Sequence, residues 1–281
     1  MKKERHVFEA LGRARIVVED GEVVEVSEPL IRYCRLWEKM RGIPELTEAR
    51  IRENITFRIQ DFGLCTKDRV LELDTFVGFG ASETFMTALR RHLLDSTVTV
   101  CEGAGTVITS NPSLVQGIGA RLSGVIETCP VKGIIQKIEA HGGEVLEPPR
   151  IDQVAGLQNA LESGHTSVGV TVADLATAQR CRALSSSALL FAVHLTGITR
   201  DAADALCDTV DLVTACASAH IRELAPRKAL LQAGTAIPIF ALTSRGKDVL
   251  LERAKEVEAP LVVNTMSLPV LPEEKQPRPL I

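Results

Sequence analysis

The sequence lacks the short signatures of several large enzyme classes. It contains no Walker A loop, no GxSxG nucleophile turn and no HExxH helix. These absences exclude the usual forms of P-loop NTPases, α/β-hydrolases and zincin metalloproteases. The triplet DFG at residues 61–63 also occurs in protein kinases. Neither an HRD loop nor a glycine-rich hairpin accompanies it here, so we do not interpret it as a kinase motif. Function has to be sought in other combinations of residues.

An excess of basic charge and long apolar runs are lacking as well. The net charge is -4 and the Lys and Arg residues are scattered, which excludes the dense basic face of a nucleic-acid-binding protein. No run reaches transmembrane length, and no long apolar segment follows the charged N-terminus, so we expect no membrane anchor or signal peptide. The seven cysteines form no CxxC pair, which favours free thiols in a reducing cytoplasm.

The material for a packed core is present, because 45% of the 281 residues are hydrophobic. Alternating apolar residues on either side of Asp20-Gly21 predict a β-hairpin over residues 13–27. A short helix is expected after Pro29, and a second helix should start at Thr47 and end near residues 61–63. These elements would precede an α/β region.

From residue 81 onwards, helical and strand patterns alternate. Apolar strands are expected at 97–101, 167–172, 188–193, 210–213 and 237–242, with helices between them. This rhythm predicts an α/β fold with a mostly parallel sheet and flanking helices. We divide the chain into residues 1–150, with the hairpin, short helices and first α/β unit, a Rossmann-like domain over 151–267, and an extended Pro-rich tail over 268–281.

Ligands collect beyond the carboxyl ends of parallel strands, so the residues there are candidates for a site. Asp174, His194 and Cys216 each follow a predicted strand, as do Thr243 and Ser244. Cys216 stands between a strand and a helix that Ser218 can cap, a place that favours a thiolate. We predict Cys216 and His194 as catalytic residues. The alternatives are a small buried cysteine and, for His194, a metal ligand or a histidine hydrogen-bonded to backbone, which is the commoner role of such a histidine.

Two glycine pairs are the candidate backbone donors for a cofactor. Gly103 and Gly105 lie in the turn CEGAGT beside Glu102, and Gly119 is followed by Arg121, an anion clamp. Neither pair has the spacing of a dinucleotide fingerprint, and tight turns in an α/β fold explain both as well. Cys34, Cys65 and Cys101 lie near irregular segments and would hold an iron–sulfur cluster or another thiolate-bound metal if folding gathered them.

The chain resembles the methanogenesis marker protein 8 family of methanogenic archaea. The likeness runs nearly end to end, through DGEVVEV, RENITFRIQDFGLCT, CEGAGTVIT, LVQGIGARLSGVIET, FAVHLTG and VTACASAHIRE. It implies an association with methane metabolism, with methyl-coenzyme M reductase or its maturation proteins as partners, and assigns no reaction. A non-catalytic assembly factor is the alternative, and a homo-oligomer is compatible with the sequence.

Residues 80–136 are similar in layout to the flavin-binding domain of the β subunit of deazaflavin-reducing hydrogenases. This second resemblance implies a flavin, with Ser82 at a helix start that faces the cofactor phosphate. The ferredoxin-like cysteine clusters of that subunit are absent, so a complete electron path is not implied. A flavin- or deazaflavin-dependent redox protein is therefore a further alternative.

Overall fold

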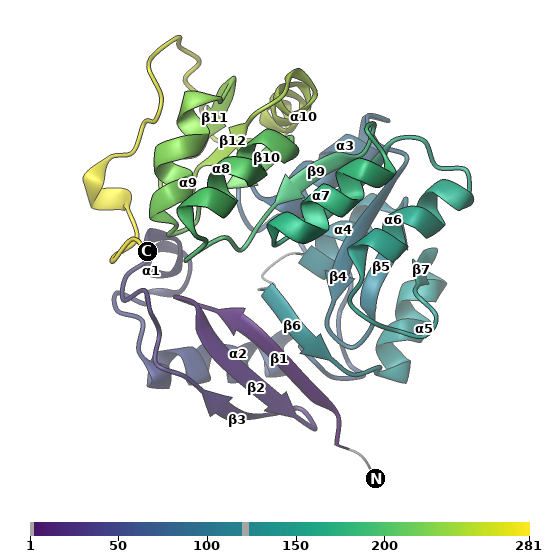
Figure 1. The fold of residues 1–281 in the computed structure, drawn as a ribbon. Coiled ribbons are helices and arrows are strands. Elements are labelled where there is room, and N and C mark those ends of the chain that lie inside the picture. Colours follow the sequence, from purple (N-terminus) through teal and green to yellow (C-terminus); the bar gives the residue numbers. More distant parts are fainter. Residues whose placement is uncertain (1–2, 120–123) are drawn as a thin grey trace.

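The computed structural model describes residues 3–119 and 124–281 and contains two β-sheets (Figure 1). The first sheet has four strands in the order β3-β2-β1-β6, all paired antiparallel. Its strands are β1 (Arg5–Ala10), β2 (Ala14–Glu19), β3 (Glu22–Val26) and β6 (Gly124–Thr128). The β2–β3 pair confirms the predicted hairpin, and Asp20 and Gly21 both adopt the positive φ that its tight turn needs.

The second sheet has eight strands in the order β11-β12-β10-β9-β8-β4-β5-β7. Its strands are β4 (Ser96–Cys101), β5 (Gly105–Thr109), β7 (Gly143–Val145), β8 (Val168–Val172), β9 (Leu189–Ala192), β10 (Leu212–Thr214), β11 (Leu231–Ala233) and β12 (Ile239–Ala241). Only β4, β8, β9 and β10 pair in parallel. The flanking pairs are antiparallel, so the expectation of a mostly parallel sheet is corrected to a mixed one.

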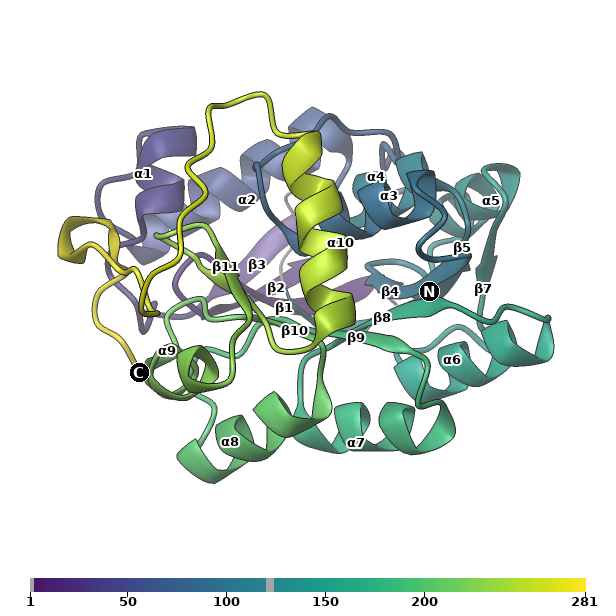
Figure 2. The same cartoon turned by 90° about the horizontal axis from the view of Figure 1, so that it is seen from above.

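Helices cover both faces of the large sheet (Figure 2). One face carries α6 (Gln153–Glu162), α7 (Leu175–Leu184), α8 (Arg200–Thr209) and α9 (Ala219–Leu224). The opposite face carries α3 (Ala81–Arg90), α4 (Pro112–Gly119) and α10 (Ser244–Lys255). Burying both faces explains why the central strands read as continuous apolar runs in the sequence.

The remaining helices belong to the N-terminal part and to the edge of the large sheet. They are α1 (Arg35–Arg41), α2 (Glu48–Phe62) and α5 (Lys132–Ala140), with short 3-10 turns at Ala225–Arg227 and Glu273–Lys275. Helix α2 begins and ends where the sequence predicts, because the Thr47 side chain accepts from the Arg50 amide and Gly63 takes a left-handed conformation at the end. No helix among the described residues is long and apolar enough to cross a membrane.

The C-terminal tail lies on the body of the protein. Tyr33 and Arg278 exchange two backbone hydrogen bonds of 3.0 Å each, and the Ile281 amide donates to the Ala217 carbonyl oxygen at 3.0 Å. The tail thus joins the segment before α1 to the segment before α9. The division of the chain at residue 150 stays a prediction; the parallel pair of β4 and β8 joins strands from either side of it.

Candidate functional site

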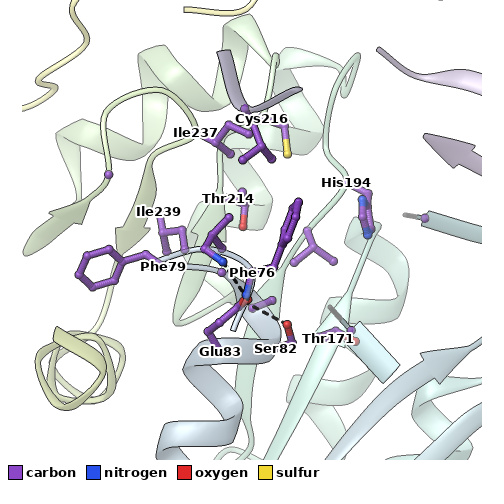
Figure 3. A pocket seen from close by; sticks show the side chains of 18 of the residues that line it. Phe76, Phe79, Ser82, Glu83, Thr171, His194, Thr214, Cys216, Ile237 and Ile239 are labelled. Atoms are coloured by element: carbon purple, nitrogen blue, oxygen red, sulfur yellow. Dashed lines mark hydrogen bonds between the residues drawn. The ribbon is translucent and has the colours of Figure 1, made fainter. Parts of the chain in front are cut away.

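A cavity of about 640 Å³ opens where the parallel strands end. Its lining includes Thr99 on β4, Thr171 on β8 and Thr214 on β10, together with His194 and Cys216, which follow β9 and β10. Figure 3 shows Thr171, His194, Thr214 and Cys216 around the same space. We call this cavity the crevice. Its position agrees with the rule that ligands bind outside the carboxyl ends of parallel strands.

Strand β12 runs antiparallel to β10, which changes one expectation about the site. Its beginning contributes Ile237 and Ile239 to the crevice, whereas its end directs Thr243 to the opposite edge of the sheet. There the Thr243 hydroxyl donates to Asp211 Oδ1 at 2.7 Å. The expectation that Thr243 and Ser244 converge with His194 and Cys216 is therefore wrong, because strand direction is not encoded in an apolar run.

The crevice has a mainly apolar wall. It is lined by Trp37, Phe76 and Phe79, with aliphatic side chains from the strands opposite. The ring centroids of Trp37 and Phe76 lie 6.4 Å apart, and the Arg58 guanidinium lies 4.8 Å from the Trp37 ring centroid. Such a surface favours a flat apolar ligand, because aromatic side chains supply contact area at low conformational cost.

A carboxylate is built into the first turn of α3. Glu83 Oε1 accepts hydrogen bonds from the Phe76 amide at 3.1 Å and the Gln116 side chain at 3.2 Å, and the Ser82 hydroxyl donates to Glu83 Oε2 at 3.1 Å. Gly80 precedes the helix and supplies no side-chain cap. The expected place for a cofactor phosphate at Ser82 is thus beside a buried carboxylate, which opposes a second negative charge.

The hydroxyl group of Thr99, a residue that lines this cavity, lacks a hydrogen-bond partner among the described residues. Thr99 itself is only 7% exposed. Buried hydroxyl groups are normally paired, and an unpaired one costs about 1–3 kcal/mol. Thr99 lines the crevice, but its Oγ1 is enclosed by protein, so a bound molecule would supply the missing partner only after a small movement of the wall.

His194 and Cys216 hold uncommon backbone conformations at the ends of adjacent strands. Their φ angles are 59° and 44°, in the left-handed region that non-glycine residues rarely adopt. The His194 side chain is exposed to the crevice, and desolvation by the protein around it lowers its pKa to about 4, whereas desolvation raises the pKa of the half-buried Cys216 thiol to about 11. Strained residues of this kind cluster at functional sites. At neutral pH the crevice therefore presents a neutral imidazole and a thiol.

The CEGAGT turn, in contrast, is packed inside the protein and is not part of the crevice lining. The Gly103 amide donates to Thr128 Oγ1 at 2.6 Å, and Glu102 Oε1 accepts from Arg69 Nε at 2.6 Å with both side chains fully buried. Gly105 lies against the Arg150 backbone. The structure gives these residues packing roles, and their predicted cofactor contacts have no geometric support.

The three predicted metal-binding cysteines are not gathered at one place. Cys65 and Cys101 lie in the interior near Glu102, and burial raises the pKa of both thiols well above the usual value. Cys34 instead lines a smaller cavity of about 210 Å³ that it shares with Cys216. Within residues 3–119 and 124–281, no group of three or more His, Cys, Asp or Glu side chains could hold a metal ion.

The second glycine pair serves helix packing. A side chain on Gly117 would overlap the Leu71 backbone, and a Cβ on Gly119 would lie 2.6 Å from Ser82 Cβ. These glycines let α4 approach the 71–72 segment and the start of α3, which places Gly119 at the crevice wall. Arg121, the predicted anion clamp, lies outside the described residues.

Sequence reasoning missed three residues that shape the crevice: Trp37, Glu83 and Thr99. Glu83 could have been found, because an acid in the first turn of a helix is favoured by the helix dipole. Thr99 is one of the alternating polar residues of a strand, and Trp37, the single Trp of the sequence, carries no motif. Their convergence depends on tertiary contacts that no local pattern contains.

Comparison with known proteins assigns the chain to a family. Residues 6–255 match the family described as "Uncharacterized protein conserved in archaea (DUF2099)". An uncharacterised protein of Methanocaldococcus jannaschii is 50% identical over 284 residues, which cover 99% of this chain and 100% of that protein. No solved structure matches the chain. Because the family model covers most of the chain and the relative is similar from end to end, the protein belongs to the archaeal family DUF2099.

Proposed function

We propose that the protein binds a flat, largely apolar organic cofactor in the crevice. The observation that carries this proposal is an apolar cavity of about 640 Å³ at the carboxyl ends of four parallel strands. Thr99 lines it, and its buried hydroxyl has no hydrogen-bond partner among the described residues. Small-molecule sites are concave, mostly apolar and about 300–1,000 Å³ in volume, with a few placed polar groups. The crevice has each of these properties.

The charged side chains around the crevice favour one orientation of a bound ligand. Glu83 is buried at the start of α3, whereas Arg35 and Lys39 line the cavity from the exposed surface of α1. An anionic group is therefore more stable near Arg35 and Lys39, and hydrogen-bond donors of the ligand are more stable near Glu83. A flavin has this chemistry, with a flat ring system that carries an N–H group and a chain that carries phosphate.

The proposed metabolic role rests on the resemblance of the sequence to a known family. The resemblance to the methanogenesis marker protein 8 family favours a role in methane metabolism, with methyl-coenzyme M reductase or its maturation proteins as partners. The 50% identical relative comes from Methanocaldococcus jannaschii, which supports an archaeal setting. The cofactor would serve that partner system either in redox chemistry or in maturation.

Anaerobic purification followed by an absorbance spectrum and metal analysis tests the cofactor proposal, since flavin, an iron–sulfur cluster and an empty site give different results. Titration with flavin mononucleotide should also change the fluorescence of Trp37, the only Trp and a wall residue of the crevice. Thr99→Val should weaken binding roughly tenfold, as expected for one lost hydrogen bond of about 1.4 kcal/mol.

Thr209→Val is the matched control for this titration. The Thr209 hydroxyl donates to the Ala205 carbonyl oxygen on α8 at 2.8 Å, and Thr209 is not part of the crevice lining. Its affinity for the flavin should equal that of the wild type. A colourless protein without metal that does not respond to flavin mononucleotide would remove flavin and iron–sulfur as candidates.

A second candidate function, partner binding without catalysis, is favoured by one surface feature. The segment after α10 exposes Leu261, Val262, Val263 and Met266, and the two valines are 94% and 91% exposed. Apolar side chains gathered on an exposed segment are typical of protein-binding sites. Replacing both valines with Ser should abolish pull-down of methyl-coenzyme M reductase components while leaving flavin binding unchanged, and unchanged pull-down would exclude this segment.

A further inference from the structure

Cys34 and Cys216 lie on one cavity although 182 residues separate them in the chain. This cavity has a volume of about 210 Å³ and shares Leu36, Trp37, His194, Cys216 and Ile237 with the crevice. Cys216 therefore lines both cavities, and Cys34 lines the smaller one. Both cysteines are half-buried, so each retains some accessible surface.

The C-terminal tail holds the two cysteine-bearing segments together. Tyr33, next to Cys34, pairs with Arg278 through two backbone hydrogen bonds. Ala217, next to Cys216, accepts a hydrogen bond from the Ile281 amide at 3.0 Å. The tail segment 278–281 thus connects the residue before Cys34 to the residue after Cys216. Backbone hydrogen bonds therefore fix the positions of the two cysteine-bearing segments.

A buried cation, Arg222, lies beside the thiols and has no anionic partner among residues 3–119 and 124–281. Arg222 is buried, and its guanidinium donates to the carbonyl oxygens of Cys216 and Ala236 and to the Gln276 side chain, all of which are neutral. No carboxylate of the described residues forms an ion pair with it. A buried charge is costly unless an opposite charge is near. A thiolate at Cys216 or Cys34 would supply that charge.

Backbone amides favour the charged form of each sulfur: those of His194 and Leu195 act to lower the pKa of Cys216, and those of Leu36 and Trp37 act to lower the pKa of Cys34. Amide donors and the positive charge of Arg222 lower the pKa of both thiols, while burial acts in the opposite direction and dominates. The resting thiols are therefore protonated at neutral pH, with groups in place to stabilise a thiolate once it forms.

We propose that Cys34 and Cys216 are a redox-active dithiol that reduces low-molecular-weight disulfides entering through the crevice. The Cys216 thiolate attacks one sulfur of R–S–S–R′, which forms a mixed disulfide and releases R′S⁻. Cys34 then attacks the Cys216 sulfur, which releases RS⁻ and leaves a Cys34–Cys216 disulfide. The two thiol protons go to the two released thiolates, so the disulfide is reduced and the protein dithiol is oxidised.

This exchange takes place among sulfur atoms alone, so it requires no bound cofactor, although Cys216 also lines the proposed cofactor site. A dithiol reductant returns the protein to its starting state by the reverse chemistry. Because the thiol pKa of Cys216 is raised to about 11, the attack should accelerate about tenfold for each unit of pH from 7 towards 10.

Dithiobis(nitrobenzoate), an aromatic disulfide that releases a coloured thiolate, is a direct probe. The reduced full-length chain should carry Cys129→Ser and Cys207→Ser, because Cys129 is half-buried and Cys207 shares the tryptic peptide 201–222 with Cys216. This chain should release two thiolates, and peptide mapping should find residues 33–35 linked to 201–222. In the same background, Cys34→Ser should keep one nitrobenzoate group on Cys216, and Cys216→Ser should remain almost unreactive.

Cys181→Ser is the matched control, because Cys181 is buried in the core on α7 and should not contribute to release. Absence of the linked peptides in the oxidised protein would overturn the proposal, as would a mixed disulfide that persists with Cys34 present. Should a serine variant fail to fold, mapping the linkage and measuring the pH dependence of release on the chain with both cysteines still decide the question.

Discussion

Among single residues, Glu102 shows how a polar side chain can be essential without touching a ligand. It forms a 2.6 Å ion pair with Arg69, and both side chains are fully buried. Removing one partner of a buried pair leaves an uncompensated charge. Glu102→Gln should therefore lower the free energy of unfolding by about 3–5 kcal/mol in urea denaturation. Adding Arg69→Met to it should restore part of the loss, and an unchanged unfolding midpoint in Glu102→Gln would contradict this role.

His194 should make stability depend on pH in a defined window. Its folded pKa of about 4 lies below the ordinary value of 6.5, so the fold favours the neutral imidazole. Well above pH 6.5 both states are neutral at this residue, and it has no effect on stability. Between pH 6.5 and 4 the unfolded chain binds a proton that the folded chain does not, so the free energy of unfolding falls as pH falls.

Urea denaturation of the wild type and of His194→Gln over this pH range measures that contribution. The wild type should lose more stability than the variant between pH 6.5 and 4, and the two should respond alike above pH 7. Parallel curves over the whole range would mean that the imidazole titrates equally in both states.

Individual elements were largely predictable where local chemistry decides them. Thr47 and Gly63 bound α2 as expected, and Ser218 caps α9 by accepting from the Ile221 amide. The strands β1, β6, β7 and β11 were missed. β6 forms part of the first sheet only by pairing with β1, more than a hundred residues earlier in the chain, and β7 and β11 have three residues each. Such strands depend on distant partners and not on their own pattern.

Gly117 allows helix α4 to pack closely against the backbone of residues 71–72. A Cβ there would overlap the Leu71 carbonyl group, so Gly117→Ala must displace α4 or the 71–72 segment. We expect a loss of about 1–3 kcal/mol in the free energy of unfolding, the usual cost of overpacking. Gly78→Ala is the control, since its Cβ would meet Val257 at an ordinary 3.6 Å and should change stability by less than about 0.5 kcal/mol. Equal stability of the two variants would mean that α4 can shift freely.

For the whole molecule, the alternation of helices and apolar strands correctly indicated an α/β protein, while the mixed character of the sheet and the contents of the crevice were beyond the sequence. An apolar strand reads the same in either direction, so β12 could not be recognised as antiparallel. His194 and Cys216 were placed correctly at strand ends because they follow parallel strands. That Cys34 and Cys216 line one cavity could not be derived from a local pattern, because the two residues lie on distant segments that the tail connects.

That tail provides a test of how the N-terminal segment is attached to the large sheet. Ending the chain after Lys275 removes the Gln276 contact to Arg222, the Arg278 pairing with Tyr33 and the Ile281 pairing with Ala217. The melting temperature should fall, and hydrogen exchange should accelerate at the amides of Tyr33 and Ala219, which now donate to tail carbonyl oxygens. Ser substitutions at Val262 and Val263 are the control, since both side chains are exposed and should leave exchange at those amides unchanged. Unchanged exchange at Tyr33 and Ala219 in the truncated chain would show that the two cysteine-bearing segments hold their positions without the tail.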